Sequence, residues 1–447
     1  MKPVSAQSAY WRYWLKPLAA RPAPFLKTTV GEFLGLLALA ALTFAFLNRG
    51  RHARADVGRY VQVIMALQLI ATTKTSVVLY FFNISWERAI AYHVLGGFFI
   101  IYLTALHGLM YLLSYFGTPG AFLEPSTQFG IVAFVCFLLM AASGQFRRKH
   151  YDIFLKLHWS LTTVAYIASF MHYGGKSLVI FTAPALLVLV VDWVWQYKHV
   201  RVVDQPTFET LPGRVVKISF PKADTEFNAG QYLQVMFPGR EYGLWERHPF
   251  TVSSNPESPS ITLHIKAFNK WSKTLYENAA KGVFPEKMWT MGPVGSLSVP
   301  LLDFAGPIVL ISGGIGCTPM VSILESLCAR GVLASEGASV RFVWSVRDAA
   351  TLTWFAARLA ELQKAHPPGK LEVELYVTSA KEAGGAAEAG FVTRAGRPAA
   401  ADLLDAACER APKAEVAVLA CGPHAMLRDV SDAVQARNAH RPSGAKL

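Results

Sequence analysis

Four histidines in two apolar segments have the residue type and spacing that suit metal chemistry. The segment "AYHVLGGFFIIYLTALHGLMYLL" holds His93 and His107, and "FLKLHWSLTTVAYIASFMHYGG" holds His158 and His172. Within each segment the two histidines are fourteen residues apart, which in an α-helix is nearly four turns and about 21 Å. Both imidazoles of a segment therefore project from much the same side, one near each edge of a bilayer's hydrocarbon core.

A neutral imidazole is a good iron ligand, so two imidazoles at one depth could hold one heme between them. If both segments run in the same direction, His93 lies level with His158, and His107 lies level with His172. Ionisable residues inside a membrane span are costly and usually functional. We therefore expect two b-type hemes at two depths in the membrane. The alternative is a set of polar residues that are hydrogen-bonded within a helical bundle.

The elements that must position these histidines lie in the apolar first half of the chain. The 447 residues are 53% hydrophobic and only 16% charged, a composition more apolar than that of most soluble proteins. The apolar excess falls in residues 28–197, and the remainder is typical of a soluble α/β protein. We predict six membrane-spanning helices, near residues 28–47, 60–81, 92–115, 129–145, 154–173 and 178–196.

The distribution of Lys and Arg indicates the orientation of these helices. Residues 1–27 are basic and aromatic, which favours an interfacial segment on the cytoplasmic face over a cleavable signal peptide. An even number of spans then puts both termini in the cytoplasm, and we expect an integral protein of the plasma membrane. The Arg-rich stretch "NRGRHARADVGR" after the first span conflicts with this orientation.

The net charge and the number of cysteines limit the functions that this protein could have. The formal net charge of +13 fits membrane-proximal basic loops and sites for anionic nucleotides. The sequence contains no basic-aromatic module, so we predict no nucleic-acid binding. Five scattered cysteines are too few for a disulfide framework or a zinc site, which indicates that the soluble half faces a reducing compartment.

Residues 199–303 carry the pattern of a small antiparallel β-barrel. The stretch "ERHPFTVSSNPESPSITLHIKAF" alternates apolar and polar residues in short strands that are broken by Pro and Ser. Arg247 and His248 offer donors for an anion. Phe250, Thr251 and Ser253 could line a flavin ring and its ribityl chain.

Residues 304–447 are typical of a doubly wound parallel sheet. The stretch "FAGPIVLISGGIGCTPMVSILESLCARG" predicts a buried strand, a Gly-rich turn and a helix. Gly313, Gly314 and Gly316 would let backbone amides approach a pyrophosphate at the helix N-terminus; the alternative is a strand-to-helix turn without a ligand. Arg347 follows a later strand and could bind a 2′-phosphate, which favours NADPH, although Asp348 beside it favours a solvated surface arginine instead.

Several motifs occur together in an order that resembles a known family. The motifs are "RHPFTVSS", "GPVG", "GGIGCTP", "FVWSVRD", "CGP" and "FRRKHYDIFLKLHW", and they accompany the two paired-His segments. Over residues 28–430 the chain resembles the ferric reductase and NADPH oxidase superfamily. The resemblance implies a six-helix transmembrane heme-binding bundle in residues 28–198 after the interfacial segment 1–27. It also implies an FAD-binding antiparallel β-barrel in residues 199–303 and an NADPH-binding doubly wound α/β domain in residues 304–447.

The resemblance implies two heme b groups, FAD and NADPH as cofactors. His93, His107, His158 and His172 would ligate the heme irons. The residues implied in FAD binding are Arg247, His248, Pro249, Phe250, Thr251, Ser254, His264, Lys266, Trp271 and Ser272, the last four near its diphosphate. Those implied around the nicotinamide dinucleotide are Gly313, Gly314, Gly316, Thr318, Pro319, Arg347, Cys421, Gly422 and Pro423. Cys421 and Arg59 are the candidate catalytic residues.

The implied activity is transfer of electrons from cytosolic NADPH through FAD and two hemes to an acceptor across the membrane. Superoxide-forming members commonly carry histidines where this chain has Trp159 and Tyr111, which favours ferric chelates as the acceptor. Arg59 matches a proposed oxygen-site arginine of those oxidases, and it could equally pair with a heme propionate or simply flank the membrane. The alternatives are a superoxide-generating NADPH oxidase and a non-catalytic heme-binding membrane partner. Because "RPSGAKL" lacks the terminal aromatic that usually covers the flavin in this family, we also expect impaired hydride transfer.

Overall fold

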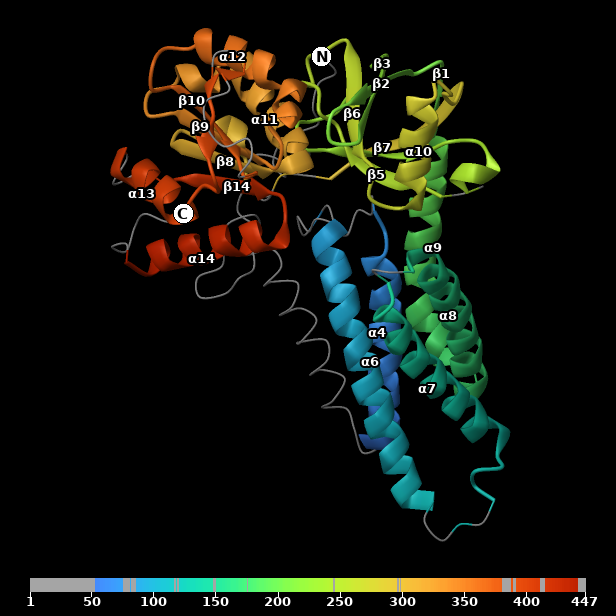
Figure 1. The fold of residues 1–447 in the computed structure, drawn as a ribbon. Coiled ribbons are helices and arrows are strands. Elements are labelled where there is room, and N and C mark those ends of the chain that lie inside the picture. The colour runs from blue at the N-terminus through green and yellow to red at the C-terminus, as the bar shows by residue number, and fades with distance from the viewer. Residues whose placement is uncertain are drawn as a thin grey trace, which may run out of the picture. The chain divides into compact units, whose positions relative to one another are not determined.

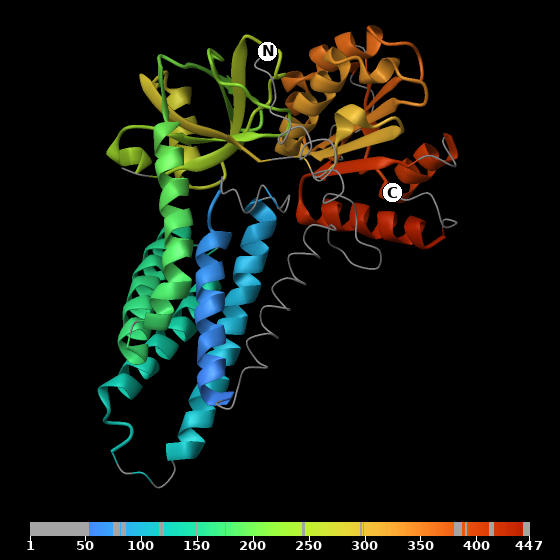
Figure 2. The same ribbon diagram turned by 180° about the vertical axis from the view of Figure 1, so that it is seen from behind.

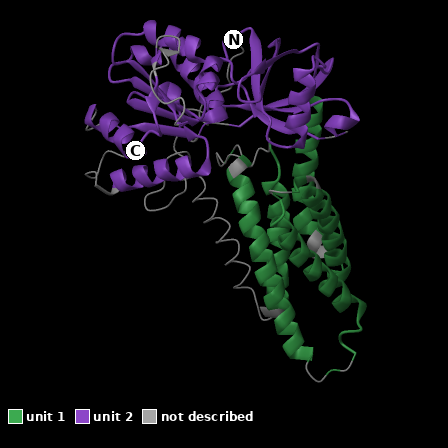
Figure 3. Ribbon diagram, in the orientation of Figure 1, with its two compact units in different colours: residues 1–198 green, residues 199–447 purple. Residues whose placement is uncertain are grey.

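The computed structural model describes residues 53–74, 81, 86–115, 118, 120–147, 150–174, 176–243, 246–295, 297, 299–379, 387–388, 391–410 and 415–440. The chain divides into two compact units, Met1–Lys198 and His199–Leu447 (Figure 3). The first unit is helical, and the second contains all of the described strands. Each unit is described by itself.

Five long helices make up the described part of the first unit (Figure 1). They are α4 (Ala53–Ala71), α6 (Trp86–Tyr115), α7 (Pro125–Gly144), α8 (Tyr151–Tyr173) and α9 (Lys176–Lys198). Helix α7 starts with Pro125 in its first turn, where a missing N–H costs nothing. Helix α8 ends at Gly174, whose φ of 67° is the left-handed conformation that glycine adopts without strain.

Three of these helices are long and apolar enough to cross a membrane by length and composition, at Arg88–Tyr115, Pro125–Gly144 and Val179–Lys198. Among the described residues α4 falls short in length, because its apolar part runs only over Val57–Ala71, and α8 carries polar residues such as Lys156. The predicted span 60–81 corresponds to α4, which begins seven residues earlier and ends at Ala71. The predicted first span and the interfacial segment 1–27 lie outside the described residues.

The helices pack through small and apolar side chains and leave apolar side chains on the outside. Met65, Ile100, Phe137 and Ala165 belong to one buried cluster that joins α4, α6, α7 and α8. Large apolar residues on the outer faces are exposed, as on α8, where Ile167 is 58% exposed. A bundle that is apolar on its outside as well as its inside suits a lipid environment.

The first part of the second unit is built from antiparallel strands. One sheet has the order β1-β7-β4-β5 and the other β2-β3-β6. The strands are β1 (Arg201–Asp204), β2 (Thr207–Leu211), β3 (Val215–Pro221), β4 (Tyr232–Met236), β5 (His248–Thr251), β6 (Ser260–Lys266) and β7 (Lys287–Val294), with helix α10 (Lys270–Ala280) between the last two. Their inner faces share one core, which includes Ile218, Leu233 and Leu263.

The details of the expected β-barrel are not confirmed by this arrangement. Among the described residues the two sheets stay separate, and one isolated bridge between Val252 and Leu263 links them. The reason is the short strand β5, which ends at Thr251, so that it pairs with β4 along its length but reaches β6 only beyond its own end. The structure is therefore an antiparallel two-sheet domain with a common core.

The second part is a parallel sheet with helices on both faces, as expected. Its order is β13-β10-β9-β8-β14, and every pairing is parallel. The strands are β8 (Pro307–Gly313), β9 (Ser339–Val346), β10 (Leu371–Val377), β13 (Arg394–Ala395) and β14 (Ala417–Cys421); the helices are α11 (Cys317–Ala329), α12 (Ala356–Lys364), α13 (Ala400–Arg410) and α14 (His424–His440). Short elements complete it: η3 (Leu301–Asp303), η4 (Gly314–Gly316), η5 (Val332–Ala334), η6 (Ala349–Trp354), β11 (Ala387–Glu388) and β12 (Phe391–Val392).

Strand β8 lies between β9 and β14 in this sheet and is buried along its whole length. Ile308 and Leu310 face the core beneath α11 and α12, whereas Val309 and Ile311 face the core beneath α13 and α14. Figures 1 and 2 show these two helix layers from opposite sides. A strand that is covered on both faces carries a continuous apolar run instead of an alternating one, which is why "PIVLIS" contains so few polar residues.

Candidate functional site

Helices α6 and α8 bring the four histidines together in two pairs. The ring centroids of His93 and His158 are 5.9 Å apart, and those of His107 and His172 are 6.0 Å apart. An iron that is bound between two imidazole nitrogens, with bonds of about 2 Å, holds the ring centroids about 6 Å apart. The separation in each pair therefore fits one iron, and the fourteen-residue spacing sets the two pairs nearly four helical turns apart.

The second ring nitrogen of two of these histidines contacts a backbone carbonyl. His93 Nδ1 lies 3.3 Å from the Gln68 oxygen, and the Gln68 side chain donates to the His93 carbonyl at 2.7 Å. His172 Nδ1 lies 2.6 Å from the Ser126 oxygen. An Nδ1–H that donates to a carbonyl leaves Nε2 as the ligand nitrogen and fixes the plane of the ring. His158 differs, because its Nδ1 is buried without a hydrogen-bond partner.

The pair formed by His107 and His172 is bordered by small residues and one tyrosine. A Cβ at Gly58 would lie 3.1 Å from the His107 ring, and one at Gly130 would lie 2.9 Å from the His172 ring. The Tyr111 ring packs 4.8 Å from that of His107, one helical turn further along α6. Arg59 follows Gly58 directly on α4 and is exposed. The structure thus brings Arg59 and Tyr111 to the same end of the bundle as this pair.

Trp159 lies elsewhere in the bundle. It adjoins His158 in the sequence, yet its ring packs against Trp193 of α9 at 5.9 Å, and the side chain is 44% exposed. Neighbouring residues on a helix point about 100° apart. Trp159 is therefore directed to the outside of the bundle, while His158 is directed to its interior.

In the second unit the Gly-rich turn and the "CGP" loop meet at one end of the parallel sheet. Strand β8 ends at Gly313 and its neighbour β14 ends at Cys421, with Ser312 opposite Cys421 in the register. A Cβ at Gly422 would lie 3.0 Å from the Gly313 nitrogen, and a Cβ at Gly313 would lie 2.7 Å from Pro423. Only glycine permits this approach of the two loops.

This meeting point is also where the strand order reverses. Strand β9 follows β8 on one side, whereas β14, from the far end of the chain, lies on the other. In open α/β sheets a dinucleotide binds in the crevice at such a switch point, with its pyrophosphate on the helix N-terminus. Helix α11 begins at Cys317 directly after the turn, and the residues Thr318 and Pro319 lie in its first turn. The crevice thus has the backbone that a dinucleotide requires.

Arg347 and Asp348 lie at the end of the adjacent strand β9. Arg347 is exposed, and Asp348 starts the short helix η6, where its carbonyl accepts from Thr351 N. The position at the end of the second strand is the one from which a side chain reaches the ribose of a bound dinucleotide. The structure therefore brings Arg347 to the same edge of the sheet as the glycines.

The "HPFT" strand β5 presents an aromatic cluster at the first part of the unit. The ring of His248 lies 4.5 Å from that of Trp271, and Phe250 is stacked on Trp271 at 5.7 Å. The Trp271 indole nitrogen is buried without a hydrogen-bond partner. Arg247 is exposed next to this cluster and directs one guanidinium nitrogen toward the Met291 sulfur at 3.2 Å. An aromatic surface beside a cation can hold a planar anionic cofactor such as FAD.

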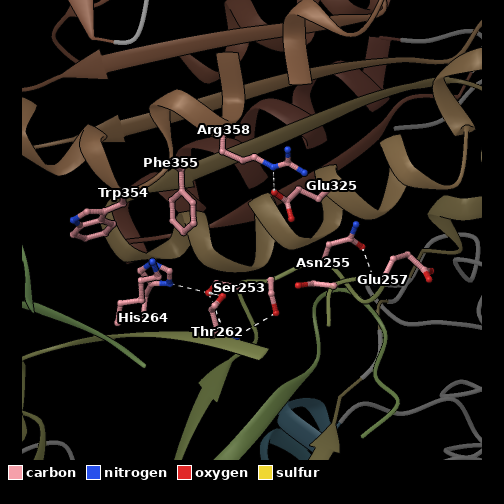
Figure 4. A pocket seen from close by; sticks show the side chains of 12 residues that line it. Ser253, Asn255, Glu257, Thr262, His264, Glu325, Trp354, Phe355 and Arg358 are labelled. Carbon is pink, nitrogen blue, oxygen red and sulfur yellow. Dashed lines mark hydrogen bonds and ion pairs between the residues drawn. The ribbon is translucent and has the colours of Figure 1, made fainter. Parts of the chain in front are cut away.

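Two of the residues expected at FAD lie in a different place. His264 and Ser254 line a cavity of about 420 Å³ together with Trp354, Phe355 and Arg358 (Figure 4), and none of the aromatic cluster of β5 lines it. The Ser254 hydroxyl accepts from Thr262 N at 3.1 Å. The roles of His264 and Ser254 at FAD stay predictions.

The remaining expected FAD residues lie around the start of helix α10. Ser272 forms a capping box with Asn269, whose side chain accepts from Ser272 N at 2.8 Å. The ammonium group of Lys266 lies 5.5 Å from the centre of the Phe268 ring. Thr251 is half-buried and Pro249 exposed on β5. A capped helix start with a lysine beside it suits a diphosphate.

Burial changes the acid–base chemistry of two candidate residues. Burial, with a smaller effect of Lys217, lowers the pKa of His264 to about 3, so the ring is neutral at physiological pH. Burial raises the pKa of the Cys421 thiol. A thiol with a raised pKa is a poor nucleophile, which favours a contact role over a covalent role for Cys421.

Some residues of these sites were missed by sequence reasoning. Gln68 could have been found, because a glutamine in the middle of an apolar helix requires a polar partner. The Ser126 carbonyl had no signal, since a backbone group is present at every residue. Trp344 is part of the motif "FVWSVRD", but nothing in the sequence indicates its partner, the Gly314 carbonyl, which accepts from the indole N–H at 3.0 Å.

Three family models match consecutive parts of the chain. Residues 57–169 match a model described as Ferric reductase like transmembrane component, residues 200–295 an FAD-binding domain, and residues 306–394 a Ferric reductase NAD binding domain. The chain belongs to the ferric reductase and NADPH oxidase superfamily. The protein thus combines a transmembrane component with binding domains for FAD and a nicotinamide dinucleotide.

The curated relatives are oxidases. Dual oxidase 1 of Sus scrofa is 25% identical over 92% of this chain and 30% of the oxidase, and dual oxidase 2 of Rattus norvegicus is 27% identical over 66% of this chain and 22% of the oxidase. NADPH oxidase 3 of Rattus norvegicus is 31% identical over 37% of this chain and 31% of its own length. The chain spans less than a third of each of these relatives. The solved cytochrome P450 reductase GcoB of Amycolatopsis is 24% identical over 55% of this chain and 69% of that chain, with a TM-score of 0.41.

Proposed function

We propose that this protein carries electrons across a membrane, from cytosolic NADPH through FAD and two b-type hemes to an acceptor on the far side. The observation that carries the proposal is the pairing of the four histidines, with ring centroids 5.9 and 6.0 Å apart. Each pair joins two helices at the separation of two axial heme ligands, and the arrangement is repeated at a second depth. Helix packing alone does not usually require such an arrangement. The membrane is the plasma membrane, and both termini are cytoplasmic.

The cofactors supply the redox chemistry, because a flavin accepts a hydride and releases electrons singly while a heme accepts one at a time. The chain supplies binding and orientation. Gly313 and Gly422 keep the crevice narrow and free of side chains, so that backbone amides can approach a pyrophosphate. Phe250, which is half-buried and stacked on the buried Trp271, provides an aromatic surface for the flavin. Backbone carbonyls at Gln68 and Ser126 orient His93 and His172.

A reduced-minus-oxidised visible spectrum of the detergent-solubilised full chain tests this proposal. We expect a b-type spectrum with two hemes per chain, and bleaching of the FAD absorbance when NADPH is added under nitrogen. A preparation with fewer than two hemes per chain would exclude the two-site arrangement. Heme without any bleaching of FAD would instead support a non-catalytic heme-binding partner.

Ferric chelates are the first candidate acceptor. Tyr111 supports them, because its ring packs 4.8 Å from His107 and covers one side of the pair that would face the acceptor. A large chelate can take an electron at the surface of the bundle without entering it. In this case Arg59, which is exposed at the same end, would attract an anionic chelate.

Dioxygen is the second candidate, and the similarity of this chain to dual oxidases and an NADPH oxidase favours it. The two acceptors are separated by measuring superoxide-dismutase-sensitive dye reduction and ferric-chelate reduction on one preparation. Arg59→Gln is expected to lower the rate with an anionic chelate more than the rate with dioxygen, because dioxygen carries no charge. Equal losses with both acceptors would argue against a role for Arg59 in attracting the chelate.

A further inference from the structure

Four aromatic rings form a continuous contact between the two parts of the second unit. His264 of β6 packs against Phe355 at 4.8 Å, and Phe355 packs against Trp344 of β9 at 6.0 Å. Trp354 lies beside both, 6.4 Å from His264 and 6.1 Å from Trp344. We name these four residues the aromatic bridge. Figure 4 shows Trp354 and Phe355 on one side of the cavity and His264 on the other.

One end of the aromatic bridge holds the Gly-rich turn. Trp344 is fully buried, and its indole N–H donates to the Gly314 carbonyl at 3.0 Å. Gly314 has a φ of 56°, a conformation that most other residues avoid, so the direction of its carbonyl depends on this unusual backbone. The indole therefore acts as a fixed donor that selects one conformation of the turn. That turn is the expected pyrophosphate site, although Trp344 itself is not expected to touch a dinucleotide.

The other end of the aromatic bridge is fixed in the antiparallel sheets. His264 Nδ1 lies 2.7 Å from the Ser253 hydroxyl, which also contacts the Thr262 carbonyl at 2.9 Å. His264 is only 6% exposed. Because burial keeps the ring neutral, with a pKa of about 3, no charge is buried against Phe355. The imidazole is thus a rigid ring on the FAD-binding side.

Further contacts also join the two parts around these rings. The Trp354 indole N–H donates to the Pro212 carbonyl at 3.1 Å, and Ser322 of α11 donates to the Ser254 carbonyl at 2.8 Å. Val215 of β3 is buried in the same core as Leu310 and Trp344. The Trp354 bond is a useful reference, because it joins the same two parts without touching the Gly-rich turn.

We propose that the aromatic bridge sets the position of the Gly-rich turn relative to the FAD-binding sheets, and that Trp344 is thereby a positioning residue for the nicotinamide dinucleotide. The inference rests on the proposed binding of the dinucleotide at the turn. It assigns to Trp344 an effect on dinucleotide affinity that acts through Gly314 and leaves the electron path beyond FAD unchanged.

The test compares Trp344→Phe with Trp354→Phe in the detergent-solubilised full chain. Each variant keeps an aromatic ring and loses one N–H donor. Binding of NADP⁺ is measured by titration calorimetry, and reduction of FAD by NADPH is followed in a stopped-flow spectrometer under nitrogen. For Trp344→Phe we expect the Kd for NADP⁺ to rise about three- to tenfold, the range that one lost hydrogen bond produces, with the maximal rate of FAD reduction unchanged. For Trp354→Phe we expect no change in Kd.

An unchanged Kd in Trp344→Phe, or an equal rise in both variants, would overturn the inference. FAD content and thermal unfolding are measured on each preparation. If Trp344→Phe does not fold, benzothienylalanine at position 344 keeps the shape of the indole and removes only the N–H, so the same change in Kd is expected. A wild-type chain that binds no NADP⁺ would refute the proposed function itself, whereas intact wild-type binding with an unaffected variant refutes only the role of Trp344.

A double variant tests the connection through Phe355. Phe355→Leu removes one of the two rings that connect Trp344 to His264. Residues of one contact network show non-additive effects, whereas independent residues show additive ones. We therefore expect the rise in Kd of the Trp344→Phe, Phe355→Leu double variant to be smaller than the product of the two single effects. A multiplicative result would contradict the aromatic bridge as one unit.

Discussion

The two imidazole pairs and the dinucleotide crevice are built by different means. In the helical unit the candidate ligands are side chains, and each is positioned by the period of a single long helix, α6 or α8. In the crevice the candidate ligands are backbone amides. The decisive residues there are Gly313 and Gly422, which have no side chain and come from loops more than a hundred residues apart. The pairs therefore depend on side chains that the repeat of a helix positions, whereas the crevice depends on the absence of side chains in two loops.

The two sites also differ in the groups that orient them, which are backbone carbonyls in the bundle and a side chain in the second unit. The His93 and His172 rings are oriented by backbone carbonyls of neighbouring helices, which no side-chain substitution removes directly. The Gly-rich turn is instead oriented by the side chain of Trp344. We expect the largest effects in the bundle from substitutions of the histidines and of the glycines beside them, Gly58 and Gly130. In the second unit we expect substitution of Trp344 to act on the turn indirectly, through the Gly314 carbonyl.

The largest effect is expected for His158→Ala. The variant removes one member of a pair, and its iron would lose an axial ligand, so we expect heme per chain to fall from two to one. The pyridine hemochromogen assay measures this. His150→Ala is the control, because His150 is exposed just before the same helix. Unchanged heme absorbance in His158→Ala would show that this pair is not a heme site. The comparison between the imidazole pairs and the dinucleotide crevice would then no longer hold.

A smaller effect is expected for Gly422→Ala. Its new Cβ would lie 3.0 Å from the Gly313 nitrogen and 3.1 Å from the Gly313 Cα, so the two loops must move apart. Overpacking of this kind costs about 1–3 kcal/mol, and we expect the Kd for NADP⁺ to rise about tenfold or more. Ala425→Ser, on the exposed first turn of α14, is the control. Equal affinities in both variants would show that the crevice tolerates the added atom.

The pH dependence of stability is expected to depend on His264. The unfolded imidazole binds a proton at its ordinary pKa of 6.5, whereas the folded one does so only near a pKa of about 3. Stability is therefore unaffected above about pH 6.5 and falls between about pH 6.5 and pH 3, by about 2 kcal/mol at pH 5. Thermal unfolding of the detergent-solubilised chain measures this, and His264→Gln should remove most of the slope. An equally steep slope in that variant would assign it to other groups.

The smallest effect is expected at Cys421. Because burial raises the pKa of this thiol, we expect iodoacetamide to modify it more slowly than free cysteine at neutral pH, with the rate still rising above the ordinary thiol pKa of 9.0. Peptide mass spectrometry resolves Cys421 from the other cysteines. Bound NADP⁺ should slow the reaction further. Rapid modification at neutral pH would indicate a thiolate and restore a covalent role.

Much of the fold was predictable because its signals are local. The apolar segments predicted α6 and α7 well, since a long apolar run has few other stable states. The bounds of α4 were less well predicted, because Gln62 and Gln68 lower its apolar character and the helix starts before the apolar run begins. The parallel sheet was predicted correctly from the alternation of strands and helices in the sequence of residues 304–447. The details of the expected β-barrel were not confirmed, because the pairing between the two sheets depends on where β5 ends, and no single residue marks that position.

The candidate site was predictable to a different extent in the two units. The four histidines could be found by spacing alone, while the FAD residues were taken as one group although His264 and Ser254 line a separate cavity. On β6, His264 projects from the side opposite to the core residues Leu263 and Ile265. Alternation along a strand predicts two faces, but it does not tell which face receives a ligand and which receives a neighbouring helix.

The sequence by itself determined the fourteen-residue separation of the histidines, the apolar helices that carry them, and the Gly-rich turn between a strand and a helix, because each depends on the repeat of a local backbone conformation. Only the tertiary structure decided that His158 has a buried nitrogen without a partner, that the loops at Gly313 and Gly422 touch, and that Trp344 holds the Gly314 carbonyl. These contacts join residues far apart in the chain, and they form only when the packing of whole helices and strands has brought those residues within reach.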